Sequence, residues 1–162
     1  MDNGLAMHRM KHSGIWGIAV VICRLKTLIM RITPENITKL ESNQIFVFGS
    51  NQSGRHGKGA AKTALGWGAV YGQAEGLQGK TYGIPSKDKS IRRTLRIDEI
   101  KPYVDRFVEF AKQHPELTFL VTEIGCGLAG LKPKKVAPLF IECKDLENIW
   151  LPARFWHKLN GI

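Results

Sequence analysis

Two glycine-rich segments constrain the fold of this chain more than any other feature, because each follows an apolar run and precedes a helix-forming stretch. The first segment, residues 49–61, has the sequence GSNQSGRHGKGAA and follows the run IFVF at 45–48. The second, residues 125–130, has the sequence GCGLAG and follows an apolar run that begins at Leu117. Short apolar runs ended by glycine predict buried strands. Each glycine-rich segment therefore predicts a loop from a strand into a helix.

The rest of the chain predicts further strands and helices in alternation. The predicted strands are 45–48, 81–84, 117–124 and 148–151, the predicted helices are 59–65, 98–113 and 133–143, and 66–79 is expected to be irregular. Pro85 is expected to stop the second strand, and Asp98 is expected to cap the second helix. This alternation is typical of an α/β domain with a mainly parallel mixed sheet, in a three-layer α/β/α arrangement.

The net charge of +10 favours an anionic partner, whether a nucleotide, a nucleic acid or an acidic surface. The basic residues are scattered, and no run of four Lys or Arg occurs, so a basic nucleic-acid arm is not indicated. Three cysteines without a CxxC pair argue against a disulfide framework and a zinc knuckle. The histidines show no metal-ligand spacing. We expect a cytoplasmic protein without a metal site.

Residues 1–29 differ from the remainder and are interpreted as an extension of a domain at 30–162. The apolar run from Ile15 to Cys23 is nine residues long, too short to span a membrane, and no cleavage pattern follows it. Secretion and membrane insertion are therefore disfavoured. Two alternatives remain: an additional β-strand, or upstream sequence translated from an early start, with Met30 as the native start.

The first glycine-rich loop is expected to bind an anion. Its glycines allow the backbone to turn and to present consecutive N–H groups, and the start of the following helix adds partial positive charge. Arg55, His56 and Lys58 add charged or titratable side chains at the same place. Together these features predict a phosphate site.

The second loop matches GxGxxG, the pattern of dinucleotide-binding sites. A Rossmann site expects this motif early in the fold and an acidic residue at the end of the next strand, whereas here the next strand ends with Leu151 and Pro152. A Rossmann dehydrogenase is therefore disfavoured. Two such loops in one small parallel sheet suit a diphosphate held from both sides, and the alternative for each loop is a tight turn.

These motifs resemble the macro domain family, whose members bind ADP-ribose and some of which hydrolyse it from proteins or process related phosphate esters. The likeness extends from about residue 31 to 155. It rests on FGSN at 48–51, GKGAA at 57–61 and GCGLAGL at 125–131. With IPSK at 84–87, the chain is most similar to a phage and bacterial branch of uncharacterised macro-like proteins.

The resemblance implies a role for individual residues. Asn51 would contact the distal ribose, and the two loops would line the diphosphate. By resemblance, the diphosphate would be lined by Gly57, Gly59, Gly127, Leu128, Ala129 and Gly130. The full set of candidate ligand-binding residues in the two loops is Gly49, Ser50, Asn51, Gly57, Lys58, Gly59, Ala60, Gly125, Cys126, Gly127, Leu128, Ala129 and Gly130. The family's Gly-Asp-Ile-Thr motif, whose Asp recognises adenine, is matched here by ENIT, with Asn36 in place of the acid. This substitution leaves adenine specificity open.

Candidate catalytic residues are Asn51, His56 and Glu123, each with a simpler alternative. Asn51 could satisfy its own backbone in a turn, His56 could be a loop histidine without a role, and Glu123 could be a solvated charge at a strand end. Cys126 is better explained by small-residue packing than by a reactive thiolate. No set of nucleophile, base and orienting group is apparent.

Five further residues are candidates for contacting a ligand. Lys87 follows a strand end and could meet an anionic ligand. Four aromatic residues are each considered as a platform for a base, with core packing as the commoner alternative. They are Trp67, Tyr71, Tyr82 and Phe155.

The leading hypothesis is therefore a protein that binds ADP-ribose or a related phosphate-bearing nucleotide, with hydrolysis of such a derivative as an additional activity. No cofactor is expected. The alternative is a basic accessory protein that binds nucleic acid without catalysis, whose affinity would fall steeply with salt.

Overall fold

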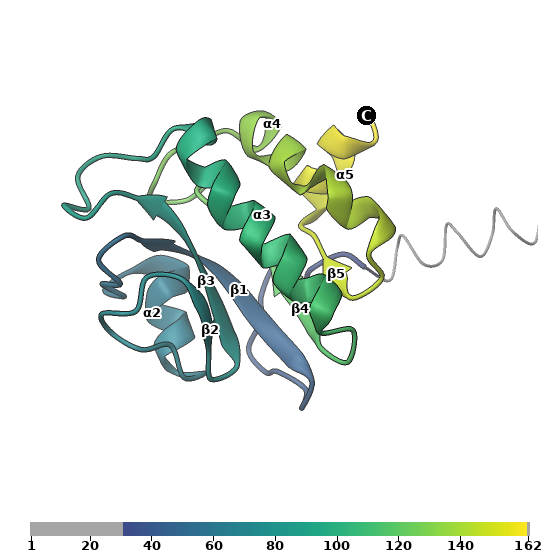
Figure 1. The fold of residues 1–162 in the computed structure, drawn as a ribbon, viewed down its shortest axis with the longest axis horizontal. Coiled ribbons are helices and arrows are strands. Elements are labelled where there is room, and N and C mark those ends of the chain that lie inside the picture. The colour runs from purple at the N-terminus through teal and green to yellow at the C-terminus, as the bar shows by residue number, and fades with distance from the viewer. Residues whose placement is uncertain (1–30, 162) are drawn as a thin grey trace, which may run out of the picture. The chain divides into compact units, whose positions relative to one another are not determined.

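The fold is organised around β1 (Gln44–Asn51), the strand predicted from its apolar run. A computed structural model describes residues 31–161 (Figure 1). The other strands are β2 (Gly76–Gln78), β3 (Thr81–Lys87), β4 (Thr118–Val121) and β5 (Ile149–Trp150). They form one sheet in the order β2-β3-β1-β4-β5. β1 is the central strand, which explains why residues 45–48 are all buried and apolar.

The helices follow the strands in alternation. They are α2 (Gly59–Leu65), α3 (Ile97–Gln113), α4 (Pro133–Val136), the 3₁₀ helix η1 (Ala137–Asp145) and α5 (Ala153–Leu159). β1 pairs in parallel with both β3 and β4, and β5 pairs in parallel with β4. Only β2 is antiparallel. The predicted α/β class with a mainly parallel mixed sheet is thus confirmed.

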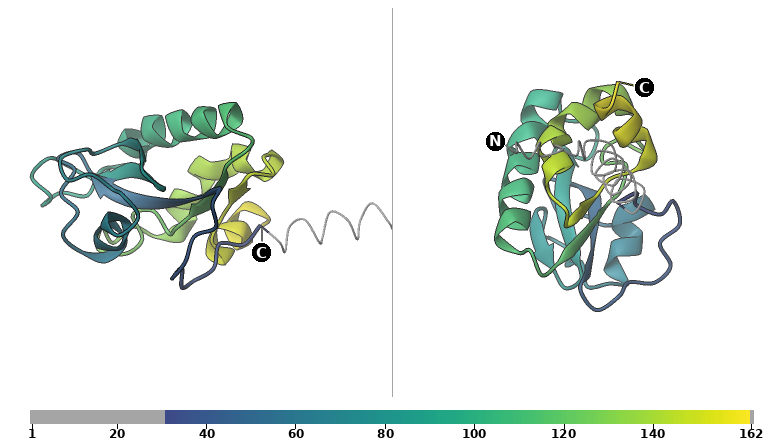
Figure 2. Two further views of the ribbon diagram at one scale, coloured as in Figure 1. Left: turned by 90° about the horizontal axis from the view of Figure 1, so that it is seen from below. Right: turned by 90° about the vertical axis from the view of Figure 1, so that its right-hand side faces the viewer.

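Helices α2 and α3 lie on opposite faces of this sheet (Figure 2). Successive side chains of a strand point to opposite faces, so Phe46 and Phe48 pack toward α2, in a cluster that includes Ala61 and Ala64. On the other face, Phe107 of α3 lies with its ring centroid 5.1 Å from Tyr82 and 5.5 Å from Phe119. Both faces of the central strands are therefore buried by helices.

The start of α3 differs from the expectation that Asp98 caps it. The N–H of Arg96, the N-cap residue, donates to Oε2 of Glu99 at 2.8 Å. The side chain of Glu99, in the first turn, therefore caps the start of the helix in place of Asp98. Asp98 pairs instead with the Arg96 guanidinium, at 2.9 Å. The helix itself covers the predicted range, because its buried residues recur at helical spacing.

Pro85 does not stop β3, contrary to the prediction, and the strand continues to Lys87. β2 pairs with β3 only as far as Gly83, and the register between β1 and β3 shifts after Pro85, where Ser86 is an additional residue of β3. A proline lacks an N–H group and is tolerated at a sheet edge or a bulge. As a result, β3 carries Ser86 and Lys87 to the same edge of the sheet at which β1 ends.

Other boundaries also differ from the predicted ones. The strand expected at 117–124 is shorter, because Thr122 turns out of the ladder and places both its N–H and its hydroxyl on Val47 O. The helix expected at 133–143 is divided into α4 and η1, and Pro138, which lacks the N–H that an α-helix needs, lies at the start of η1. The short elements β2 and α5 were not predicted.

The interpretations of residues 1–29 concern a part of the chain outside the described residues. Within residues 31–161, no helix combines the length and the apolar character needed to cross a membrane.

Candidate functional site

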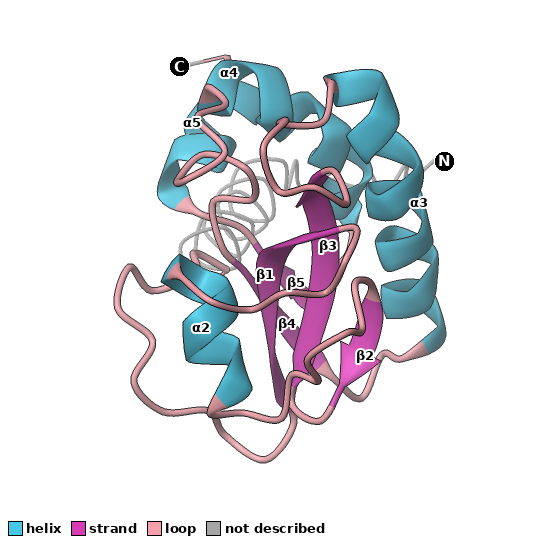
Figure 3. Ribbon diagram, turned by 90° about the vertical axis from the view of Figure 1, so that its left-hand side faces the viewer, coloured by secondary structure: helices cyan, strands magenta, loops and turns pink. Residues whose placement is uncertain are grey.

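A cavity of about 800 Å³ opens at the carboxyl ends of the central strands. β1 is followed by α2 and β3 on one side, whereas β4 is followed by α4, η1 and β5 on the other. Ligands of open α/β sheets bind where neighbouring strands send their connections in opposite directions. The volume is within the range of about 300 to 1,000 Å³ that is common for ligand sites. Figure 3 shows the loops that surround these strand ends.

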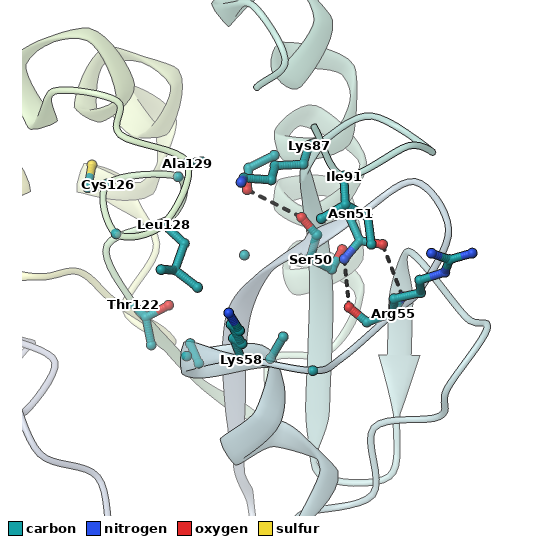
Figure 4. Close-up of a pocket in the computed structure, with 18 of the residues that line it drawn as sticks. Ser50, Asn51, Arg55, Lys58, Lys87, Ile91, Thr122, Cys126, Leu128 and Ala129 are labelled. Carbon is teal, nitrogen blue, oxygen red and sulfur yellow. Dashed lines mark hydrogen bonds between the residues drawn. The ribbon is translucent and has the colours of Figure 1, made fainter. Parts of the chain in front are cut away.

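Most residues proposed from the sequence to bind a ligand line this cavity. They are Gly49, Ser50, Asn51, Gly57, Lys58, Gly59, Ala60, Gly125, Cys126, Gly127, Leu128 and Ala129. Glu123 and Arg55 line it as well, whereas Gly130 and His56 do not. In Figure 4, Leu128 and Ala129 lie on one side of the cavity, Asn51 and Ile91 on the other, and Lys58 between them.

Three lining residues were missed by the sequence reasoning: Ser86, Ile91 and Thr122. Ser86 was placed in a surface loop because Pro85 was expected to stop the strand. Its hydroxyl instead donates to Ser50 O at 3.3 Å, which joins the ends of β3 and β1. A signal was present, since residues beyond the end of a parallel strand lie at the same sheet edge as the glycine-rich loops.

The second loop presents unpaired backbone donors to the cavity. The N–H of Gly130 donates to Gly127 O at 2.9 Å and closes a turn around Leu128 and Ala129. Thr94 Oγ1 donates to Ala129 O at 2.7 Å and holds the loop in place. Within residues 31–161, the N–H groups of Gly127, Leu128 and Ala129 have no acceptor. A buried or ligand-facing N–H needs a partner, so this loop can accept an anion.

The first loop presents a second group of donors from the start of α2. The first N–H groups of a helix lack intrahelical acceptors, and Gly59, Ala60 and Ala61 occupy these positions and line the cavity. α2 has only seven residues, so the individual N–H groups matter more here than the helix dipole assumed from the sequence. The two groups of donors come from different loops that line the same cavity.

Asn51 organises the first loop through its own side chain. Its Oδ1 accepts the N–H of Arg55 at 3.0 Å and the hydroxyl of Ser53 at 2.8 Å, and its Nδ2 donates to Arg55 O at 2.7 Å. The side chain is 6% exposed. Asn51 thus forms hydrogen bonds within its own turn, which is the alternative role considered from the sequence. An amide carries two N–H donors, and residues 31–161 accept only one of them.

Close backbone approach requires glycine at position 54 of this loop. Gly54 has φ +66°, and an added Cβ would lie 2.5 Å from the backbone nitrogen of Gln73. The N–H of Gly72 donates to Gly54 O at 2.9 Å. The first loop is thus packed directly on the segment that carries Tyr71.

The charged side chains around the cavity are mainly cationic. Arg55, Lys58 and Lys87 line it, and Glu123 is the one acidic residue among the described residues that do so. Glu123 is not a free carboxylate, because its Oε2 accepts from Arg154 Nη1 at 2.9 Å. The cavity therefore favours an anionic ligand, and Glu123 can act as a base only when this ion pair opens.

The proposal of His56 as a catalytic residue is not supported by its position. The ring is 1% exposed and does not line the cavity. Its Nε2–H donates to the carbonyl oxygen of Val70 at 3.0 Å, and its centroid lies 5.3 Å from that of Phe48. The sequence could not show this role, because both partners come from elsewhere in the chain. His56 packs in the core and ties the two segments together.

Cys126 lines the cavity but is not an activated thiolate. Burial and, second to it, the negative charge of Glu123 raise the pKa of the thiol to about 11. The thiol hydrogen donates to Ile124 O at 3.5 Å. The thiol is thus predominantly protonated near neutral pH, in agreement with its interpretation as a packing residue.

Of the four aromatic residues considered as base platforms, Tyr71 alone lines the cavity. Tyr82 and Phe155 are buried in the core, and Trp67 packs edge-on against Phe46 with centroids 4.9 Å apart. Their candidacy as ligand platforms is therefore wrong. Asn36, which replaces the family's adenine-binding acid, is exposed and is not among the lining residues.

The segment between β3 and α3 carries Ile91 to the cavity in a strained conformation. Ile91 has φ +65°, a region that β-branched residues rarely adopt. Two backbone hydrogen bonds hold this segment. The N–H of Asp88 donates to Arg93 O at 3.0 Å at its base, and the N–H of Ile91 donates to Asp88 O at 3.1 Å at its tip. Strain of this kind persists only where the surrounding structure imposes it.

The fold and the cavity define an α/β protein with an anion-favouring ligand site at the switch point of its sheet. Among the described residues, no group of three or more His, Cys, Asp or Glu is arranged to hold a metal ion. No protein-family model matches the chain, and no curated protein or solved structure matches it either. Its function is therefore inferred from the cavity.

Proposed function

We propose that the cavity binds ADP-ribose or a related nucleotide through its diphosphate. The observation that carries this proposal is the pair of donor groups on two loops that line one cavity, at Gly59–Ala61 on α2 and at Gly127–Ala129 on the second loop. Two phosphates joined by one bridging oxygen present acceptors to more than one group of donors at the same time. Lys58, next to the start of α2, lines the same cavity and supplies a cation (Figure 4).

The resemblance to macro domains supports an orientation for the sugar. In that family an asparagine at the position of Asn51 contacts the distal ribose. Here the unused Nδ2–H of Asn51 is the group available for such a contact, while its other polar contacts keep the loop in shape. Asn51 therefore acts on the ligand in two ways, by a direct hydrogen bond and by positioning Arg55.

Recognition of the base is proposed to be permissive. Asn36 does not line the cavity, and Tyr71 is the one aromatic residue among the described residues that does. A tyrosine face stacks on any base. We therefore expect ADP-ribose and its guanine analogue to bind within about fivefold of each other, because stacking gives little discrimination.

The proposal is for binding first, and hydrolysis is a further step that requires a base. Glu123 is the carboxylate at the cavity, and it is ion-paired with Arg154. If the protein hydrolyses its ligand, opening of this pair releases the group that activates water. Hydrolysis would then depend on Glu123 more strongly than binding does.

The test is calorimetric titration of the full 162-residue chain with ADP-ribose. We expect saturable 1:1 binding that weakens by about five- to tenfold in Lys58→Ala, as for loss of one charge-assisted contact. The matched control is Lys62→Ala, which removes the same charge from an exposed position on α2 outside the cavity. The control should remain within about twofold of the parent. Absence of saturable heat, or equal losses in both variants, would contradict the proposal.

A further inference from the structure

A second pocket, of about 370 Å³, lies where α4 and α5 meet. Its lining residues are Lys132, Pro133, Lys134, Arg154, His157 and Lys158. Five of these six carry basic side chains, and none is acidic. The two helices adjoin each other in Figure 1, so residues more than twenty positions apart in the chain form one basic surface, which we term the basic pocket.

The lysines of the basic pocket have no acidic partner among the described residues. Within residues 31–161, Lys132, Lys134 and Lys158 form no ion pair. Arg154 is paired with Glu123. The pocket thus has four permanent cations, of which this one acid neutralises one. Like charges held together repel one another at the short range that salt does not screen. A bound polyanion would relieve this repulsion.

The basic pocket is next to the cavity along the chain and in space. Only Leu131 separates Lys132 and Pro133 from the second glycine-rich loop in the sequence. Arg154 lines the basic pocket and Glu123 lines the cavity, and their side chains meet at 2.9 Å. The two pockets therefore adjoin at one ion pair, with the acid on the side of the cavity and the cation on the side of the basic pocket.

We infer that the basic pocket binds the phosphodiester backbone of a single-stranded nucleic acid. Three lysines and an arginine match a row of phosphates, and a concave pocket admits one strand. Among the described residues, the His157 ring is the one aromatic group that lines the pocket, so these residues offer little platform for stacking bases. It therefore contacts the backbone rather than the base sequence.

This chemistry predicts the salt dependence of binding. Each phosphate neutralised on a single strand contributes about −0.7 to the slope of log K against log salt. With about three phosphates in contact, we expect a slope of about −2. Thymine and adenine strands of equal length should bind within about threefold of each other, because the bases are not contacted.

The experiment is a fluorescence anisotropy titration of the full chain against labelled oligothymidine of about 15 nucleotides. The test variant, Lys134→Glu with Lys158→Glu, reverses two charges in the basic pocket. The control, Lys39→Glu with Lys62→Glu, makes the same change in net charge at exposed positions outside both pockets. We expect Kd to rise at least tenfold in the test variant and less than about threefold in the control.

Three outcomes would overturn the inference. Equal losses in both variants would show that net charge, not the basic pocket, attracts the strand. An unchanged Kd in both variants would show that the basic pocket does not bind the strand. Displacement of the strand by polyglutamate of equal charge would assign the pocket to acidic proteins. A milder pair, Lys134→Ala with Lys158→Ala, guards against unfolding, and unchanged ADP-ribose titration of the test variant separates this site from the cavity.

Discussion

Arg93 and Glu99 form a two-bond ion pair, with Nη1 2.7 Å from Oε2 and Nη2 3.1 Å from Oε1. Arg93 belongs to the segment that carries Ile91, and Glu99 belongs to the first turn of α3. The pair attaches this segment to a helix that packs in the core. A contact between two surface residues thus contributes to holding a cavity-lining residue in its strained backbone conformation.

Replacement of Ile91 by asparagine is expected to stabilise the protein. Asparagine tolerates a positive φ far better than a β-branched residue, so Ile91→Asn should raise the free energy of unfolding by about 1 kcal/mol. Ile91→Val keeps the branching and the strain and is the matched control. Urea unfolding measures both. A loss of stability in the asparagine variant as large as in the valine variant would mean that the conformation costs little.

The ion pair of Glu99 should make stability depend on acid pH. Hydrogen bonds from Arg93 and from the Arg96 backbone lower the pKa of Glu99 from 4.5 to about 2. A lowered pKa in the folded state stabilises it above the ordinary pKa, and this contribution is lost as pH falls from about 4.5 to about 2. Glu99→Gln should therefore be less stable than the parent near neutrality, with the difference shrinking across that range.

Thermal unfolding at a series of pH values measures this difference. Glu109→Gln on the same helix is the control, since the carboxylate of Glu109 accepts from Gln113 rather than from a cation. A constant difference between Glu99→Gln and the parent down to the lowest pH would argue against the ion pair as its source.

Asn51→Ala is expected to lower both stability and ligand affinity. Removal of the amide leaves the N–H and the carbonyl of Arg55 without their part-buried hydrogen bonds, which costs about 1 to 3 kcal/mol at about 0.5 to 1.5 kcal/mol for each bond. Asn51→Asp retains Oδ1 and its contacts with Ser53 and Arg55, and loses the donor. It should be destabilised less than the alanine variant. Urea unfolding and ADP-ribose titration are measured on the same samples. Lost affinity at unchanged stability would show that Asn51 acts on the ligand alone.

Cys126 is expected to react slowly with iodoacetamide. Burial and Glu123 raise its pKa to about 11, so only about a thousandth of the thiol is ionised near pH 8. Glu123→Gln removes the negative charge that contributes to this raised pKa. The pKa of Cys126 should therefore fall, and the reaction should become faster. Peptide mass mapping follows Cys126 separately, with Cys143, whose pKa burial raises to about 12, as an internal reference. Rapid alkylation near neutral pH would contradict this assignment.

The central strands and the two loops were predictable because their signals are local. Burial on both faces makes β1 uninterruptedly apolar, and the loop glycines occur where backbone N–H groups must be exposed. The helical spacing of α3 was equally clear. These elements place twelve of the thirteen proposed ligand-binding residues around the cavity, all except Gly130.

The features that were missed depend on partners distant in sequence. Pro85 lies within a strand because β2 pairs with β3 only as far as Gly83. No local sequence pattern shows how far a neighbouring strand extends. β2 itself has three residues and forms only by pairing with β3. His56 was misjudged for the same reason, since its partner Val70 lies on another segment. Tertiary contacts determine the structure at such residues, whereas local hydrophobic periodicity predicts the longer helices and strands.

The ion pair between Glu123 and Arg154 joins a residue that lines the cavity to one that lines the basic pocket. A ligand at the cavity that displaced Glu123 from this pair would release Arg154 to bind an anion at the basic pocket. Thermodynamic linkage requires the effect to be reciprocal, so an anion that recruits Arg154 must change affinity at the cavity by the same factor. One surface contact of 2.9 Å would thereby make occupancy of each pocket a regulator of the other.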